Sequence, residues 1–148
     1  MPQSATDAAA TDNPLLATWP TPFRMPPFEA IAPVHFEPAF TSALASHERE
    51  IEAIAGNGEP PTFANTIDAL ELAGRALTRV ARVFYNLTGS HTNPELQAIE
   101  RKMAPRMARH STAIALNEPL FRRVDALWQK RDQLGLDDEQ MRVLERTH

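Results

Sequence analysis

Prolines decide where this chain can be helical. Ten of its 13 prolines lie before residue 62, and seven of those fall between Pro14 and Pro38. Proline lacks a backbone N–H and clashes with the preceding turn, so this density excludes a regular helix there. The stretch also carries many apolar side chains: Leu15, Leu16, Trp19, Phe23, Met25, Phe28, Ile31, Val34 and Phe36. We therefore expect a disordered terminus over residues 1–13, then an extended proline-rich arm over 14–37 that lies against a larger body.

From residue 38 onward the apolar residues recur with helical spacing. Steps of three and four place them on one face of each segment, which is typical of amphipathic helices. The predicted fold class is all-α, with about five antiparallel helices forming a domain over residues 38–148. The predicted helices run from residue 38 to Gly56, from 63 to roughly Gly89, from Pro94 to about 114, from 118 to Gly135, and from Asp138 onward.

Two residues lie where a helix tolerates them poorly. Gly74 falls on the apolar stripe of the second helix, where it costs about 1 kcal/mol relative to alanine but lets a neighbour approach closely. The stripe keeps its phase on both sides, so we expect this helix to continue through the glycine. Pro105 falls inside the third helix, and a kink is expected there.

Residues 47–51, His-Glu-Arg-Glu-Ile, resemble the zinc-protease signature His-Glu-x-x-His. The signature needs two histidines four residues apart, so that one helix face presents both imidazoles to the metal. Ile51 stands in the second position and cannot be a ligand. Since His47 lies on the apolar stripe between Leu44 and Ile51, we interpret it as a core residue and assign no catalytic or metal residue here.

Composition narrows the class of protein. A net charge of -4 argues against nucleic acid as the main partner, and the absence of cysteine excludes disulfides and thiolate zinc sites. Residues 1–74 carry a net charge of -8 and residues 75–148 one of +4. An anion-binding face in the second half, attraction between the halves and plain solvation of both all fit this pattern. No membrane span or leader is evident, which predicts a soluble cytoplasmic protein.

The last predicted helix has hardly begun when the sequence stops. Met141 and Leu144 start an apolar stripe, and no glycine or proline follows to end it. An amphipathic helix this short is not stable without a partner for its apolar face. We therefore expect a fragment, truncated within its last helix, that can self-associate through this face or through the arm.

The order of motifs resembles a known family. PPFEAIAPVHFEPAF, the pattern PTFxNTIxALExxGxxLxRV over residues 61–80, and QLGL over residues 133–136 are similar to the N-terminal region of the thimet-oligopeptidase-like, M3-type zinc metallopeptidases. Within that family the resemblance is strongest to bacterial peptidyl-dipeptidases, also called dipeptidyl carboxypeptidases, with oligopeptidase A as a sister group. It spans about residues 13–148.

The resemblance implies the N-terminal part of a larger, almost entirely helical enzyme that encloses a deep channel. Its parent would be a zinc peptidase that releases dipeptides from the C-terminus of short peptides, with this segment as channel wall or lid. The family's zinc ligands match no position here, so the chain alone is predicted to be inactive and to hold no cofactor. Its implied partners are the missing C-terminal catalytic domain and, for the parent, short peptides; its own substrate-binding residues stay undefined.

Two alternatives remain at this point. A free-standing helical interaction module would use the basic residues of the second half as its contact surface. A small metal enzyme would have to assemble a site from His35, His47, His91 and His110, none of which lie three or four residues apart. The basic side chains that could meet a substrate are Arg101, Lys102, Arg106, Arg109, Arg122 and Arg123.

Overall fold

The computed structural model describes residues 12–148. Residues 1–11, most of the predicted disordered terminus, lie outside this range. The described chain is helical and has no β-strand, which confirms the all-α prediction. None of the described helices is long and apolar enough to cross a membrane. The chain divides into two compact units, one holding residues 12–47 and 74–108 and the other residues 48–73 and 109–148.

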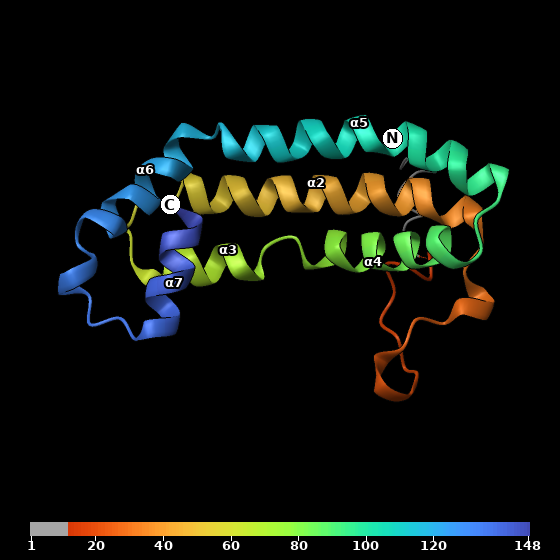
Figure 1. The fold of residues 1–148 in the computed structure, drawn as a ribbon, viewed down its shortest axis with the longest axis horizontal. Coiled ribbons are helices and arrows are strands. Elements are labelled where there is room, and N and C mark those ends of the chain that lie inside the picture. The colour runs from red at the N-terminus through yellow and green to blue at the C-terminus, as the bar shows by residue number, and fades with distance from the viewer. Residues whose placement is uncertain (1–11) are drawn as a thin grey trace, which may run out of the picture. The chain divides into compact units, whose positions relative to one another are not determined.

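Three helical segments form the body of the first unit. They are the start of α2 (Phe36–Ala55), α4 (Arg75–Ser90) and the first part of α5 (Pro94–Ala115), and α4 runs opposite to the other two (Figure 1). The Phe84 ring lies edge-on to Phe36, at 5.0 Å between centroids, and to Phe40, at 5.4 Å. Leu44, Leu77, Leu96 and Met103 of the predicted apolar stripes are buried in this core, together with four residues beside those stripes: Ala39, Ala43, Val80 and Val83.

The proline-rich arm is folded onto the first unit by a few specific contacts. It contains three short 3-10 turns (Pro22–Arg24, Phe28–Ala30 and Pro33–His35), and α2 begins at Phe36, two residues before the predicted start. Pro38 is tolerated there because the first turn of a helix needs no N–H donor. Leu15 is buried in the core, and Trp19 packs against it. The arm is therefore anchored at its beginning and at its junction with α2.

The second unit is built around two smaller helices. These are α6 (Glu118–Gln129) and α7 (Asp138–Thr147), which pack against each other and against a π-helical turn (Phe63–Asp68) that leads into the short helix α3 (Ala69–Leu72). One core cluster joins the π-helical turn to both helices, and a second joins the end of α2 to the start of α6. Their fully buried members are Ile67, Val124, Leu127 and Leu144 in the first cluster and Ile51, Ile54 and Leu120 in the second.

Side-chain caps fix where several of these helices begin. Thr62 and Asn65 cap the π-helical turn reciprocally: the Asn65 N–H donates to Thr62 Oγ1 at 3.0 Å, and the Thr62 N–H to Asn65 Oδ1 at 2.7 Å. Asp137 and Gln140 do the same for α7, as predicted. Asn117 accepts the N–H of Leu120 at the start of α6. Each cap satisfies donors that a helix leaves unpaired in its first turn.

The prediction of one helix from residue 63 to 89 is wrong. The backbone leaves the helical conformation at Ala73 (ψ 148°) and Gly74 (φ 73°), which separates α3 from α4. A φ near +70° is open to glycine but costs other residues about 1–2 kcal/mol. The apolar stripe keeps the same spacing across the break, so hydrophobic periodicity alone could not reveal it. By contrast, α5 continues from Pro94 to Ala115 through Pro105.

Candidate functional site

The histidine of the His-Glu-Arg-Glu-Ile stretch lies against the Gly74 break. A Cβ built on Gly74 would stand 2.8 Å from Cε1 of His47 and 2.9 Å from its Nε2. The imidazole is half-buried and Glu48 is exposed. His47 thus fills the space that the missing glycine side chain leaves, a packing role within the first unit.

This contact predicts a stability effect at Gly74. Gly74→Ala should lower the free energy of unfolding by about 2 kcal/mol, because alanine meets both the unfavourable φ and the His47 ring. Gly135 provides a matched control: its φ is +63°, and nothing lies within 4 Å of an added Cβ. Gly135→Ala should cost about 1 kcal/mol, the conformational part alone. Urea unfolding followed by far-ultraviolet circular dichroism measures both. Equal losses at the two glycines would contradict the contact.

The other histidines of the small-metal-enzyme alternative are dispersed. His35 accepts the N–H of Ala32 at its Nδ1, at 2.9 Å, and so caps the turn before α2. His110 is buried in α5, and His91 is exposed after α4. Over residues 12–148 no three histidine, aspartate or glutamate side chains form a group that could hold a metal ion.

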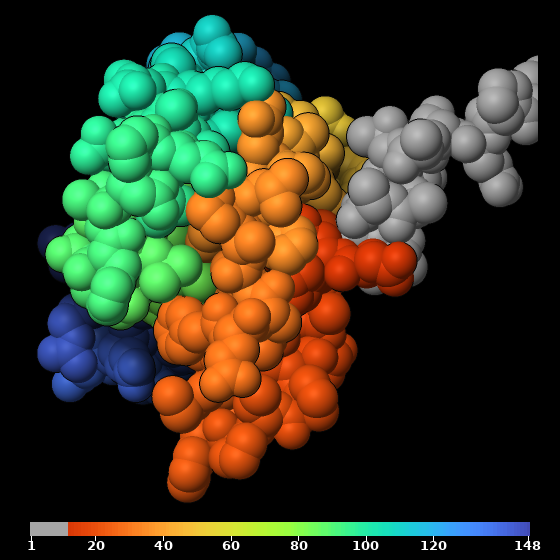
Figure 2. All heavy atoms as spheres, turned by 90° about the vertical axis from the view of Figure 1, so that its right-hand side faces the viewer, coloured from red at the N-terminus to blue at the C-terminus, as the bar shows by residue number. Residues whose placement is uncertain are grey.

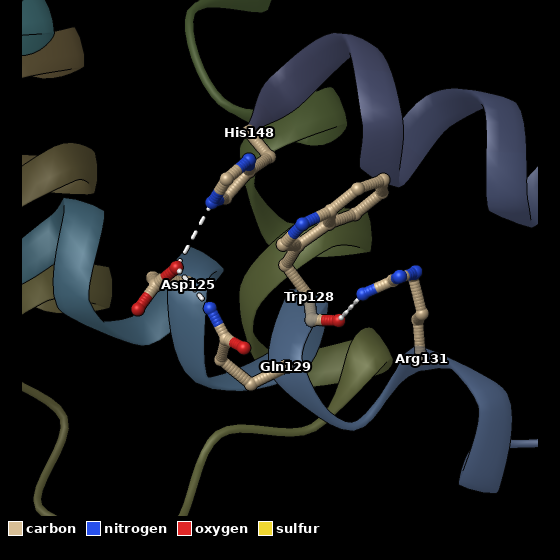
Figure 3. Close-up of polar contacts among 5 residues, drawn as sticks. All are labelled: Asp125, Trp128, Gln129, Arg131 and His148. Carbon is tan, nitrogen blue, oxygen red and sulfur yellow. Dashed lines mark hydrogen bonds and ion pairs between the residues drawn. The ribbon is translucent and has the colours of Figure 1, made fainter.

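A polar cluster at the α6–α7 end of the second unit went unpredicted. His148 Nε2 lies 2.9 Å from Asp125 Oδ1, and Gln129 Nε2 donates to the same oxygen at 3.2 Å (Figure 3). The His148 ring stacks on Trp128 at 4.9 Å, and the Arg131 guanidinium lies over the Trp128 ring at 4.3 Å. Arg131 Nη1 also donates to the Trp128 carbonyl at 2.8 Å. The Trp128 side chain lies between these two groups in Figure 3.

These contacts alter the acidity of Asp125. The hydrogen bond from His148, with a smaller one from Gln129, holds the pKa of the Asp125 carboxyl below its ordinary value. The cluster contains one carboxylate and one imidazole but no hydroxyl or thiol nucleophile among its residues. It can tie α7 to α6, whereas nucleophilic catalysis needs a third group that is absent from it.

The lowered pKa predicts a pH effect. A depressed carboxyl pKa stabilises the fold above the ordinary value and loses that contribution as pH falls through the folded-state pKa. His148→Gln removes the first cause of the depression, so the Asp125 carboxyl should titrate closer to its ordinary value. Carboxyl carbon shifts of Asp125 in a 13C NMR titration measure this. His91→Gln, at an exposed loop histidine, is the control and should leave the curve in place; unchanged titration in His148→Gln would contradict the contact.

Most of the basic side chains considered from the sequence have partners within the chain. Lys102 pairs with Glu37, and Arg122 pairs with Glu118 one turn earlier in α6. Arg106 donates to Thr41 Oγ1 at 3.0 Å. Arg101 and Arg109 are exposed on α5. These residues therefore do not converge on one anion site.

Arg123 is buried in the second unit, with 7% of its surface exposed. Its Nη1 donates to the carbonyls of Asn57 at 2.8 Å and Glu59 at 2.9 Å, and its Nη2 donates to Asn65 Oδ1 at 3.0 Å. No acidic side chain is among these acceptors. The guanidinium thus holds the loop between α2 and the π-helical turn.

The face that the sequence suggested for self-association is largely occupied. Leu144 is fully buried against Ile67, Val124 and Leu127, and Met141 is half-buried. Leu144 therefore offers no free surface in the second unit.

Comparison with known proteins identifies the relatives of this chain. It is 45% identical over 138 residues to dipeptidyl carboxypeptidase of Escherichia coli (strain K12), a match that covers 93% of this chain. The Salmonella typhimurium dipeptidyl carboxypeptidase is 43% identical over 92% of the chain. Oligopeptidase A of Salmonella typhimurium is 33% identical over 74%. These relatives are M3 peptidases.

The resemblance to M3-type peptidases that the motifs predicted is confirmed. The match covers only a small part of the length of each relative. The chain spans 20% of the length of the two dipeptidyl carboxypeptidases and 15% of that oligopeptidase A. It aligns with the N-terminal part of the larger peptidase. The chain matches no protein-family model.

Proposed function

We propose that this chain is the N-terminal helical part of a zinc-dependent, M3-type peptidyl-dipeptidase. The observation that carries the proposal is the 45% identity to a dipeptidyl carboxypeptidase over 93% of this chain. Because the chain spans only 20% of that relative, the catalytic residues would belong to the remainder of a longer polypeptide.

The proposed role of the segment is structural. Residues 14–37 would form the arm and residues 38–148 a helical domain that serves as wall or lid of the substrate channel. Such a wall excludes folded proteins and shields the reacting peptide from bulk water. The all-helical build supports a scaffold rather than a reaction centre, as do the buried guanidinium of Arg123, which binds backbone carbonyls, and the packing of His47 against Gly74.

The implied zinc does not fit the residues described here. A catalytic zinc needs three protein ligands and an open position for water. Residues 12–148 bring no three suitable side chains together, and the chain has no cysteine. No step of peptide hydrolysis is therefore assigned to this chain, and by itself it is proposed to be inactive.

The proposed substrates of the whole enzyme are short peptides with a free C-terminus, from which dipeptides are released. Its proposed location is the cytoplasm, in keeping with a sequence that contains no cysteine.

The test uses the polypeptide encoded by the complete gene. It is incubated with an N-terminally blocked pentapeptide, either with a free C-terminal carboxylate or amidated, with and without a zinc chelator. The proposal predicts dipeptide release from the free form, abolished by the chelator and restored by zinc, and little from the amidated form. Internal cleavage of both peptides would favour an oligopeptidase, and no hydrolysis would overturn the proposed activity.

A further inference from the structure

The arm presents four large apolar side chains to solvent. Phe23 is 96% exposed, Met25 55%, Phe28 43% and Val34 68%. We call these four residues the arm surface. They lie within a segment whose two ends are buried, at Leu15 and Phe36. The arm therefore divides its apolar residues between the core of the first unit and the outside.

The two ends of the arm, on either side of the arm surface, are held by specific contacts. Arg79 of α4 donates from Nη2 to the Leu15 carbonyl at 2.8 Å and to the Ala17 carbonyl, and its guanidinium lies over the Trp19 ring at 4.1 Å. Trp19 Nε1 donates to the Pro14 carbonyl at 2.7 Å. Asn13 Nδ2 donates to the His35 carbonyl at 2.8 Å and so joins the two ends of the arm. A fixed segment loses little conformational freedom when it binds.

The backbone of the arm turns outward at a cost. Phe23 (φ 58°) and Arg24 (φ 54°) both adopt the left-handed conformation, although neither is glycine. The Thr21 hydroxyl donates to the Met25 carbonyl across this turn. Residues held in such conformations cluster where a chain binds something. Here the turn directs the Phe23 ring into solvent, where 96% of its surface is exposed. In Figure 2 residues 20–38, in red and orange, face the reader.

The charge of the arm indicates which class of partner its exposed surface could bind. Residues 12–38 contain one basic residue, Arg24, and three acidic ones, Asp12, Glu29 and Glu37. Nucleic acids and anionic membranes require clustered lysine or arginine, so neither suits this surface. Exposed apolar groups on an otherwise weakly charged segment fit another protein surface of apolar character.

We propose that the arm surface is the docking face for the remainder of the longer polypeptide. The match covers 93% of this chain but 20% of the dipeptidyl carboxypeptidase, so about four-fifths of such a polypeptide lies outside this segment and could cover the arm surface. This inference rests on the proposed function, and it names the part of the segment that makes the contact. The central contacts would be the rings of Phe23 and Phe28, since aromatic anchors dominate such interfaces.

Oxidation of methionine by dilute hydrogen peroxide tests the proposal. Met25 and Met103 provide an internal pair, because Met25 is 55% exposed and Met103 only 1%. Since oxidation follows exposure, Met25 of the 148-residue chain should react at least about tenfold faster than Met103. In the polypeptide from the complete gene, the oxidation rate of Met25 should fall by about tenfold or more, while the oxidation rate of Met103 should equal that in the short chain. Mass spectrometry of proteolytic peptides gives both rates.

A substitution sharpens the same experiment. Phe28→Ser in the complete polypeptide should restore several-fold faster oxidation of Met25, because it removes one anchor of the docked surface. Tyr85→Ser, at an exposed aromatic of α4 outside the arm, is the matched control and should not. Equal Met25 rates in the short and complete polypeptides would overturn the proposal. Protection that appears in the short chain alone as its concentration rises would overturn it in favour of a second copy.

The outcomes separate the docking proposal from the proposed function. A complete polypeptide that releases dipeptides but oxidises Met25 freely keeps the function and loses the docking face. One that protects Met25 but releases no dipeptide keeps the docking face and loses the activity. A gene that ends at residue 148 overturns both.

Discussion

Phe84→Ala is expected to lower the free energy of unfolding of the first unit by about 4 kcal/mol. The Phe84 side chain is fully buried and meets the rings of Phe36 and Phe40 edge-on. Its removal deletes buried apolar area, leaves a cavity and ends both ring contacts. Urea unfolding followed by Trp19 fluorescence, in a Trp128→Phe background, reports on this unit because Trp19 packs against its core.

Phe23→Ala is the matched control, since it makes the same chemical change at a ring that is 96% exposed. Its effect should stay within about 0.5 kcal/mol. Similar losses for the two variants would show that the aromatic cluster does not hold the first unit together.

Arg123→Met is expected to destabilise the second unit by about 3 kcal/mol. Methionine keeps most of the buried stem but removes three hydrogen bonds, to the carbonyls of Asn57 and Glu59 and to Asn65. The buried Nε of Arg123 has no hydrogen-bond partner, and loss of that unsatisfied group offsets part of the cost. Trp128 fluorescence in a Trp19→Phe background follows the unfolding of this unit.

Arg122→Met is the neighbouring control. Arg122 is exposed and forms a surface ion pair with Glu118, so its loss should cost less than about 0.5 kcal/mol. Arg123→Lys keeps the positive charge, but its single ammonium group cannot reach all three acceptors as the planar guanidinium does. It should therefore recover less than half of the stability that Arg123→Met loses. An Arg123→Met variant as stable as Arg122→Met would mean that the loop does not depend on the guanidinium.

The presence of most helices could be predicted from the sequence, because apolar spacing and capping depend on residues only three or four positions apart. Phe36, Phe40 and Leu44 recur at four-residue steps, and all are buried as the spacing predicts. The Asp137–Gln140 capping box was evident from the residue types alone. Both signals reflect interactions between residues three or four positions apart, which a sequence displays directly.

The break at Gly74 was missed because spacing reports which residues face the core, not the backbone torsions between them. Leu70 and Leu77 keep a seven-residue interval across a chain that is not helical at Ala73. The available signal was Gly74 itself, combined with a bulky His47 on the facing stripe. Gly74 and His47 are 27 positions apart, so the sequence alone does not show that they are in contact.

The polar contacts of the second unit were also beyond the sequence. Arg123 binds carbonyl oxygens of a loop more than 60 residues earlier, and backbone acceptors leave no trace in residue types. Asp125 meets His148 across 23 positions. The assignment of no catalytic or metal residue to the His-Glu-Arg-Glu-Ile stretch stays a prediction, which the following measurement tests.

The most direct test is to assay the purified 148-residue chain, with zinc added, against a blocked peptide with a free C-terminus beside the polypeptide from the complete gene. Our account predicts dipeptide release by the complete polypeptide and no hydrolysis above background by the short chain at any zinc concentration. Zinc-dependent cleavage by the short chain, lost in His47→Ala, would contradict the account and place a metal site where we find only packing.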